Sequence, residues 1–384
     1  MKVLHIISSG GMYGAEAVIL HMSRALKEGS NRSVLGVFLN ASNPNLQLHE
    51  AALKDGTESH PIPCKGRLDW TAIRSIRELA ADADVVHAHG YKADIHVYLA
   101  MRKSGTPMVS TCHTWYDHDR KDRFFGTVDR LILRRYAGVV AVSESVRERL
   151  VRAGVPSQNI SIIRNGIDLR MFGQTSATLK DELGWNSCLL VGLVGRLAAE
   201  KGVDIFLIAA ASVLQKLPAT KFVVVGDGPD RNALETLIDE LGIRQSVRLL
   251  GRRDDMPAVY ASFDLMISSS RREGLPMAIL EGMASRRPLI ATPVGAVPSV
   301  VLDGRTGVLV PAEDPARLAA EIVELLHDKP RREHLAASAR LLVEQQFSAQ
   351  RMTADYLRVY ETAIASRFRG HSKKASVDTQ GISG

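Results

Sequence analysis

REGLPMAILEGMA, residues 272–284, follows the apolar run DLMISSS (264–270), which predicts a buried strand. Pro276 suits the first turn of a helix, where its missing N–H group costs nothing. The sequence therefore predicts a strand, a tight turn and a helix. Glu273 stands before the turn and Glu281 lies further along, inside the helix.

This arrangement suits a phosphorylated ligand. The start of a helix offers unpaired N–H groups and the positive end of the helix dipole, which favour a phosphate. A carboxylate further along the helix can accept hydrogen bonds from two neighbouring hydroxyls, as on a ribose. The stretch therefore predicts a site for a nucleoside diphosphate that carries a further group.

Strand-like apolar runs alternate with helical patterns along the chain, which predicts an α/β protein with parallel sheets covered by helices. The number of runs predicts two such sheets. We expect strands at 2–8, 33–39, 85–89, 107–113, 138–143, 189–195, 221–226, 247–251, 264–270 and 288–293. We expect helices near 15–27, 70–80, 92–103, 144–152, 202–216, 230–241, 276–285, 314–326, 331–345 and 349–367.

A small, polar segment at 171–180 predicts the boundary between two domains. The expected domains are 1–170 and 171–347, followed by a helix at 348–367 that packs on the first domain. The tail at 368–384 is rich in Ser, Gly and Lys and is expected to be disordered. The Asn-Gly pair in NGID (165–168) indicates a turn or hinge.

The composition is that of a soluble protein, with 384 residues, of which 45% are hydrophobic and 24% charged. The sequence contains no apolar run of about 18 residues, so we expect no membrane span. The N-terminus enters a strand pattern directly and predicts no signal peptide. The three widely spaced cysteines suit a reducing compartment, so a cytoplasmic location is expected.

Positive charge is concentrated in the first half. Residues 1–170 carry 23 Lys and Arg against 17 Asp and Glu, whereas residues 171–384 carry 26 against 25. Residues 120–135 combine six basic residues with apolar ones, so this segment suits the surface of an anionic membrane. The alternative is a solvated helix that packs its apolar face on the domain core. Nucleic acid is not expected, because no recognised binding motif accompanies the charge.

Ligands of parallel sheets bind outside the carboxyl ends of the strands, and the candidate residues lie in loops after strands. Arg196 and Lys201, in GRLAAEKG (195–202), could both reach a diphosphate and offset the charge on a departing phosphate. The alternative is a surface turn with two solvated cations. The position of this loop, in the same domain as Glu273, favours the functional interpretation.

Two glycine-rich loops are weaker signals. GDGPDR (226–231) offers Gly226 and Gly228 for close approach to a base or ribose, but Arg231 replaces the third glycine of a dinucleotide fingerprint. SSGGMYGAE (8–16) offers free N–H groups at Gly10 and Gly11, without the Gly-Lys-Ser/Thr of a phosphate-binding loop. A tight turn and a plain helix entry are the structural alternatives.

His113 ends an expected strand and precedes Trp115, Tyr116 and Asp117, a mixture suited to sugar contacts. A structural role is the common alternative for a single histidine. Two Asp-x-Asp triplets, at 82–84 and 117–119, raise the question of a metal. The first precedes its strand and indicates a turn, and no further ligand cluster supports the second. We therefore expect no catalytic metal.

The motifs together resemble the family-4 retaining glycosyltransferases of the GT-B fold, over nearly all of residues 1–367. The resemblance rests on GGMYGAE, RNGID, VGRLAAEKG, VVVGDGP, EGLPMAILE and TPVGAVPSVVLDGRTGVLV. It implies two facing Rossmann-like domains with a cleft between them. The first would bind the acceptor and the second the nucleotide sugar, which is the donor substrate rather than a tightly bound cofactor.

The resemblance also implies roles for single residues. Glu281 would hold the ribose hydroxyls and Glu273 would contact the donor sugar. The diphosphate would be held by Arg196, Lys201 and the backbone of Gly274 and Leu275.

Further roles follow from the same resemblance. His113 would contact the sugar near the reacting carbon, and the loop at Gly10 and Gly11 would approach the diphosphate. Gly226, Gly228 and Arg252 complete the expected nucleotide site.

The sequence departs from the family pattern at one turn, where Ala296 replaces a usual Gly and Ser299 a usual Glu. Because this turn is expected near the donor sugar, the departure bears on sugar identity and not on the diphosphate site.

The expected reaction transfers a glycosyl unit with retention, by positioning and by stabilising the leaving diphosphate. A UDP-sugar is favoured over GDP-mannose, and the basic first half favours a glycan or lipid-linked acceptor of the cell envelope. The alternatives are a nucleotide-sugar 2-epimerase, a non-catalytic scaffold and, more distantly, a nicotinamide oxidoreductase.

Overall fold

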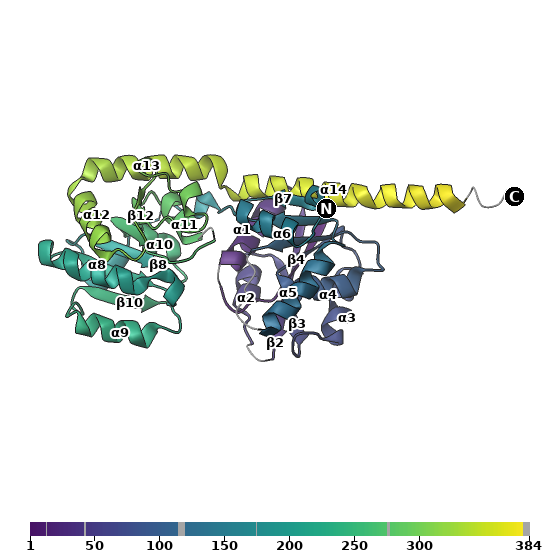
Figure 1. Cartoon of the computed structure of the whole chain (residues 1–384), viewed down its shortest axis with the longest axis horizontal. Coiled ribbons are helices and arrows are strands. Elements are labelled where there is room, and N and C mark those ends of the chain that lie inside the picture. Colours follow the sequence, from purple (N-terminus) through teal and green to yellow (C-terminus); the bar gives the residue numbers. More distant parts are fainter. Residues whose placement is uncertain (13, 42–43, 114–119, 174, 275–276, 379–384) are drawn as a thin grey trace. The chain divides into compact units, whose positions relative to one another are not determined.

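The computed structural model describes residues 1–12, 14–41, 44–113, 120–173, 175–274 and 277–378. The chain divides into two compact units (Figure 1), the first formed by residues 1–166 with the segment from 349 onward, the second by 167–348. The division falls inside the NGID segment, where a turn or hinge was expected, rather than after residue 170.

The first unit contains a seven-stranded parallel sheet with the order β3-β2-β1-β4-β5-β6-β7. Its strands are β1 (Lys2–Ile7), β2 (Arg32–Asn40), β3 (Glu58–Cys64), β4 (Val85–His89), β5 (Met108–Cys112), β6 (Gly138–Ala141) and β7 (Ile160–Ile162). Its helices are α1 (Gly14–Glu28), α2 (Gln47–Lys54), α3 (Trp70–Leu79), α4 (Tyr91–Met101), α5 (Arg120–Leu133), α6 (Glu144–Arg152), η1 (Ser157–Asn159) and α14 (Ala349–Asp378). The sheet order is that of doubly wound α/β folds.

The second unit contains a six-stranded parallel sheet with the order β10-β9-β8-β11-β12-β13. Its strands are β8 (Leu190–Val194), β9 (Lys221–Val225), β10 (Val247–Gly251), β11 (Leu265–Ser268), β12 (Leu289–Ala291) and β13 (Val308–Leu309). Its helices are η2 (Leu169–Met171), α7 (Leu179–Leu183), η3 (Ala199–Lys201), α8 (Val203–Lys216), α9 (Arg231–Glu240), α10 (Met256–Ala261), α11 (Met277–Ala284), η4 (Val297–Ser299), α12 (Pro315–His327) and α13 (Lys329–Gln346). The prediction of two parallel sheets is confirmed.

The central strands are buried on both faces, which explains their continuous apolar sequences. In the second unit, Phe206 of α8 packs edge-on against Phe222 of β9, with ring centroids 5.8 Å apart. Aspartates cap two helices of this unit, α12 and α13. Asp314 accepts a hydrogen bond from the backbone of Arg317 at 2.9 Å, in the first turn of α12.

Three strands, β3, β7 and β13, were not predicted, and β7 has only three residues. Pro61 and Pro63 lie within β3 and break the usual strand signal, because proline cannot donate to a ladder. The structure tolerates them because β3 is the edge of the sheet and pairs only with β2 among the described strands. β13 has only two residues, too few for a pattern to show.

Helix α14 returns the chain to the first unit, where it lies against α1, β4, β5 and β6 (Figure 1). Tyr356 and Tyr360 are its buried anchors. The helix runs on to Asp378, through residues 368–378 where disorder was predicted from composition. This segment contains no proline, the residue that most strongly ends a helix.

Candidate active site

In the second sheet, the order in which successive strands are added reverses between β8 and β11. Because β8 lies between β9 and β11, the loops after β8 and β11 leave neighbouring strands at the carboxyl edge of the sheet. This is the switch point at which open α/β sheets bind ligands. Four loops meet near this edge, namely 195–202, 226–230, 269–274 and 292–296.

Glycines let these loops touch. A Cβ atom on Gly226, whose φ is +134°, would lie 1.9 Å from the carbonyl oxygen of Gly195. A Cβ on Gly295, whose φ is +57°, would lie 1.8 Å from the carbonyl oxygen of Glu273. No side chain fits at such distances, so the backbone of one loop lies directly on the next.

Lys201 and Glu273 form the polar centre of this edge. The Nζ atom of Lys201 lies 2.5 Å from Oε1 of Glu273, and the Ser270 hydroxyl donates to the same oxygen at 2.7 Å. The Glu273 side chain is only 8% exposed and that of Lys201 is 23% exposed. Both contacts are to Oε1, so neither uses Oε2. The pairing was not predicted, and nothing in the sequence indicated Ser270 as a partner.

The loop that carries Arg196 is docked on the loop that carries Glu273. The carbonyl oxygen of Glu200 accepts a hydrogen bond from the Arg271 backbone N–H at 2.8 Å. The Arg196 guanidinium forms an ion pair with the Glu200 carboxylate, and its side chain is 47% exposed. Arg196 is therefore held against its own loop, which also carries Lys201, and part of its side chain is open to solvent.

Glu281 lies on α11 and accepts a hydrogen bond from the Tyr260 hydroxyl, at 2.7 Å from Oε2. Burial raises the pKa of Glu281, and the bond from Tyr260 opposes this rise. Burial and the nearby carboxylate raise the pKa of Tyr260, so the tyrosine stays a neutral donor. Tyr260 is a residue that the sequence did not indicate, because it lies in the short α10 with no motif around it.

The other predicted nucleotide-binding residues lie along the same edge. A Cβ on Gly228 would lie 2.2 Å from the carbonyl oxygen of Leu197, so this glycine fits against the 195–202 loop. The Gly226 N–H donates to the Gly251 carbonyl at 2.8 Å, which brings the loop that begins with Arg252 beside it. A role of these residues in binding a nucleotide stays a prediction.

The turn at the start of α11 is described in part. The carbonyl oxygen of Gly274 accepts a hydrogen bond from the Ala296 N–H at 3.2 Å. The departure from the family pattern at Ala296 therefore lies directly against the glutamate turn. Leu275 and Pro276 lie outside the described residues.

In the first unit, the loop after β1 contains Gly10 and Gly11. The Ser9 hydroxyl accepts a hydrogen bond from the Gly11 N–H at 3.2 Å and donates to the Gly11 carbonyl at 2.8 Å, which fixes a tight turn. The Met12 N–H donates to the Gln47 side chain at 3.2 Å. Because it follows β1, the loop lies at the carboxyl edge of an interior strand of its sheet.

His113 follows β5 at the same edge. Its Nε2 atom lies 3.5 Å from Nδ1 of His89, the last residue of β4, and the two rings stack with centroids 5.8 Å apart. Burial lowers the pKa of His113 to about 4, so its ring is uncharged at neutral pH. The aromatic and acidic residues that follow it, 115–117, lie outside the described part of the chain.

The Asp-x-Asp triplet at 82–84 lies at the amino end of β4, as predicted. Asp84 accepts a hydrogen bond from the Lys2 N–H at 2.7 Å, and Asp82 forms an ion pair with the Lys2 side chain. Both carboxylates therefore fasten β1 to the turn before β4. The second triplet, 117–119, lies outside the described residues.

Comparison with known proteins places these features in a family. Residues 12–170 match the sequence model described as Glycosyltransferase Family 4, and residues 189–328 match the one described as Glycosyl transferases group 1. An alpha-D-kanosaminyltransferase from Streptomyces kanamyceticus is 31% identical over 304 residues, which are 74% of this chain and 78% of the relative. An N-acetyl-alpha-D-glucosaminyl L-malate synthase from Bacillus anthracis is 28% identical, over 84% of this chain and 85% of the relative.

Solved structures share the fold over almost the whole length. The crystal structure of Anabaena HepE in complex with UDP-glucose superposes with a TM-score of 0.82, at 22% identity, over 93% of this chain and 99% of that one. Sucrose-phosphate synthase from Thermosynechococcus elongatus superposes with a TM-score of 0.78, at 19% identity, over 95% of this chain and 99% of that one.

Proposed function

Because this chain belongs to the group 1 and family 4 glycosyltransferases, whose fold is GT-B, we propose that it transfers a hexosyl unit from a UDP-sugar to a glycan or lipid-linked acceptor. We further propose that the anomeric configuration is retained and that no metal is needed.

The Lys201–Glu273 pair at the switch point carries this proposal. The ammonium group of Lys201 and the carboxylate of Glu273 lie 2.5 Å apart, so they could bind the diphosphate and the sugar of one nucleotide sugar. Lys201, with Arg196 on the same loop, would offset the charge of the leaving diphosphate. Glu273 would accept hydrogen bonds from hydroxyls of the donor sugar through Oε2.

The nucleotide would lie beside these groups. Glu281 would accept hydrogen bonds from the two ribose hydroxyls, with its other bond from Tyr260 holding the carboxylate in place. The UDP and UDP-glucose complexes of HepE, a protein of the same fold, support a uridine nucleotide. GDP-mannose is the alternative donor.

The chemistry would rely on positioning and electrostatics. Removing a single preorganised donor that stabilises charge developing in the transition state costs about 10²–10³ in rate, and a similar loss is expected for a cation at the departing diphosphate. The departing phosphate oxygen would take the proton of the acceptor hydroxyl, so no separate general base is required. In this scheme the neutral ring of His113 would contact the sugar close to the reacting carbon.

The first unit would bind the acceptor. In α5, Leu133 packs into the core of the unit, whereas Leu131 is 55% exposed, and Arg135, two residues after the helix, is also exposed. The exposed apolar and basic side chains support contact with an anionic surface such as the inner face of the plasma membrane, where lipid-linked envelope glycans would be built. None of the helices in the described part of the chain combines the length and apolar character needed to cross a bilayer.

Nucleotide binding tests the donor site first. UDP at about a hundred times its dissociation constant should stabilise the chain by roughly 2.7 kcal/mol, measurable as a thermal shift. GDP, ADP and NAD at the same concentration should shift it less. Glu281→Ala should lose the UDP shift, and Glu240→Ala, an exposed glutamate on α9, should retain it. A shift with NAD alone would contradict the proposal and favour an oxidoreductase.

Product analysis separates the remaining alternatives. Incubation with UDP-glucose, UDP-galactose and UDP-N-acetylglucosamine, each with and without an envelope glycan extract, should give an acceptor-dependent product with the donor's anomeric configuration. Interconversion of two UDP-sugars without acceptor would identify a 2-epimerase. UDP binding with no turnover of any donor would identify a scaffold, and an inverted product would refute retention.

A further inference from the structure

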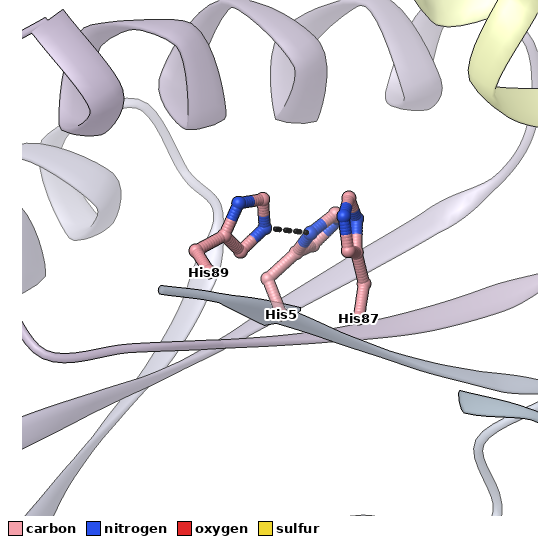
Figure 2. Close-up of side chains that lie close together, drawn as sticks. All are labelled: His5, His87 and His89. Atoms are coloured by element: carbon pink, nitrogen blue, oxygen red, sulfur yellow. Dashed lines mark hydrogen bonds between the residues drawn. The ribbon is translucent and has the colours of Figure 1, made fainter. Parts of the chain in front are cut away.

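Four histidines lie on one face of the first sheet. His5 of β1 is the register partner of His87 of β4, and His89 lies two residues further along the same strand. His113 lies two residues beyond Thr111, the register partner of His89. Because side chains alternate between the faces of a strand, these rings emerge on the same side. Figure 2 shows three of them together, with the bond between His5 and His89.

Three of these imidazoles form a chain that leads into the interior. The Nε2 atom of His113 lies 3.5 Å from Nδ1 of His89, and Nε2 of His89 lies 3.2 Å from Nδ1 of His5. The Nε2 atom of His5 is buried and has no partner among the described residues. The chain of imidazole contacts therefore ends at His5.

A second branch fastens the chain to helix α14. The two ring nitrogens of His87 contact the Tyr360 hydroxyl at 2.7 Å and the Thr111 hydroxyl at 2.8 Å. The Tyr356 hydroxyl contacts Thr111 at 2.9 Å. The His87 ring lies against that of His89, with centroids 4.1 Å apart. These contacts leave the His89 ring little freedom to turn.

The same three residues, His5, His87 and His89, offer nitrogens within 4.8 Å of one another, a spacing that a metal ion could use. Two observations speak against a metal. Both nitrogens of His87 are engaged by hydroxyls. The described cluster holds no carboxylate or thiolate, so a buried dication would lack compensating charge.

The unpartnered Nε2 atom of His5 determines which nitrogen of each imidazole carries the proton. Burial lowers the pKa of His5 to about 3 and of His113 to about 4, and burial also lowers the pKa of His89, so each ring is neutral with one N–H. The protons must then all point along the chain in the same direction. If they pointed toward His5, its Nε2–H would be a buried donor without an acceptor, which is rare in proteins. If they point toward His113, only a lone pair is left without a partner.

We propose that His89, with His5 behind it at the end of the chain, is the positioning residue that holds His113 as the tautomer protonated on Nδ1. His89 donates from Nδ1 to Nε2 of His113, and the Nδ1–H of His113 is left as a donor for a hydroxyl of the transferred sugar. This last step rests on the proposed glycosyl transfer, whereas the tautomer itself does not.

The tautomer can be measured without any substrate. In the full chain labelled with ¹⁵N-histidine, two-bond ¹H–¹⁵N correlations distinguish Nδ1–H from Nε2–H rings, and His113→Gln identifies the His113 signal. His96 is an internal reference, because its Nε2 accepts from the Asp69 N–H at 3.2 Å and its Nδ1 therefore donates to the Lys92 carbonyl at 2.7 Å. We expect His113 to show the same Nδ1–H pattern as His96.

Two variants at one position test the cause. His89→Asn retains an amide N–H near the place of Nδ1 and should keep His113 as Nδ1–H. His89→Leu removes the donor and should convert His113 to Nε2–H or to a mixture. His5→Leu moves the unpartnered nitrogen to Nε2 of His89 without touching His113, so by the same argument His113 should stay Nδ1–H, and an Nε2–H ring in this variant would contradict the proposal.

The proposal is overturned if His113 is an Nε2–H ring in the wild-type protein, or if it stays Nδ1–H in His89→Leu. A stoichiometric metal in purified protein, lost on His5→Leu, would also overturn it. Where transfer is observed, His89→Leu should lower kcat by about tenfold to a hundredfold with little change in donor KM, and His89→Asn should restore it. Absent transfer would contradict the proposed function and leave the tautomer measurement decisive for this inference.

Discussion

Two glycines with nearly the same backbone conformation allow a controlled test of the loop packing. Gly202 has a φ of +60° and Gly242 a φ of +68°. A Cβ on Gly202 would lie 2.1 Å from the carbonyl oxygen of Ser269, whereas a Cβ on Gly242 would meet no atom within 4 Å. Gly202 follows Lys201 directly, and Gly242 follows α9. Replacing each by alanine therefore separates the cost of the conformation from the cost of the clash.

The expected magnitudes differ. Alanine at a left-handed position costs about 1–2 kcal/mol, and this is the whole effect expected for Gly242→Ala. Gly202→Ala carries the same cost and in addition forces the 195–202 and 269–274 loops apart. Overpacking of this kind costs about 1–3 kcal/mol more. The displacement also moves Lys201 away from Glu273, so we expect UDP to bind at least tenfold more weakly, which corresponds to about 1.4 kcal/mol.

Urea denaturation of both variants measures the first quantity, and isothermal titration with UDP measures the second. Gly242→Ala should keep wild-type affinity for UDP despite its loss of stability. Equal losses of stability in the two variants would show that the close approach at Ser269 relaxes without cost. Unchanged UDP affinity in Gly202→Ala would show that the loop contact does not shape the donor site.

Lys201→Met should lower the transfer rate by about 10²–10³ in steady-state assays, because the leaving diphosphate loses a cation. A smaller loss would show that other groups stabilise the charge on the diphosphate. Tyr260→Phe removes a hydrogen bond that lowers the pKa of Glu281, so Glu281 should become protonated at a higher pH. Titration calorimetry should therefore show UDP affinity falling at a higher pH on acidification than in the wild-type protein. An unchanged or lower pH for this fall would contradict the assigned role. EDTA should leave transfer intact, and loss of activity restored by manganese would overturn metal independence. Arg135→Glu should weaken binding to anionic vesicles at low salt more than Arg102→Glu, an exposed arginine after α4, and equal binding by the two would discard the membrane proposal.

Arg134, the neighbour of Arg135, is unsuited to the vesicle test. Its guanidinium donates to the Ala153 carbonyl at 2.7 Å and so satisfies the end of α6. Charge reversal there would disturb that helix end as well as the surface. The sequence alone could not separate these two arginines, because only the fold determines which one reaches a backbone carbonyl.

The sequence predicted the architecture because its signals are local. Runs such as KFVVV at 221–225 indicate buried parallel strands without any knowledge of their neighbours. Placing Lys201 and Glu273 in loops after strands was enough to predict a common edge, since carboxyl ends of parallel strands meet there. The structure places the two side chains in contact.

The remaining features depend on contacts between distant residues. Tyr260 and Glu281 are 21 residues apart, and the hydroxyl of Tyr360 reaches His87 across 273 residues. Neither pair belongs to a motif, and tyrosine or histidine in a helix or strand is by itself an ordinary core residue. The histidine chain behind His113 could therefore be recognised only once register had aligned β1, β4 and β5.

The glycines show how a motif can mark the right place for a different reason. Gly226 and Gly228 were interpreted as openings for a ligand, yet the atoms that exclude a side chain there are carbonyl oxygens of Gly195 and Leu197. Their immediate effect is to let neighbouring loops lie on one another and so to fix the edge on which Lys201 and Glu273 meet. Such glycines are required whichever sugar is bound. Sugar identity must therefore depend on side chains that project from these loops. The exposed Ser299 is the first such residue to mutate. Ser299→Glu should alter the preference among donor sugars without altering the affinity for UDP.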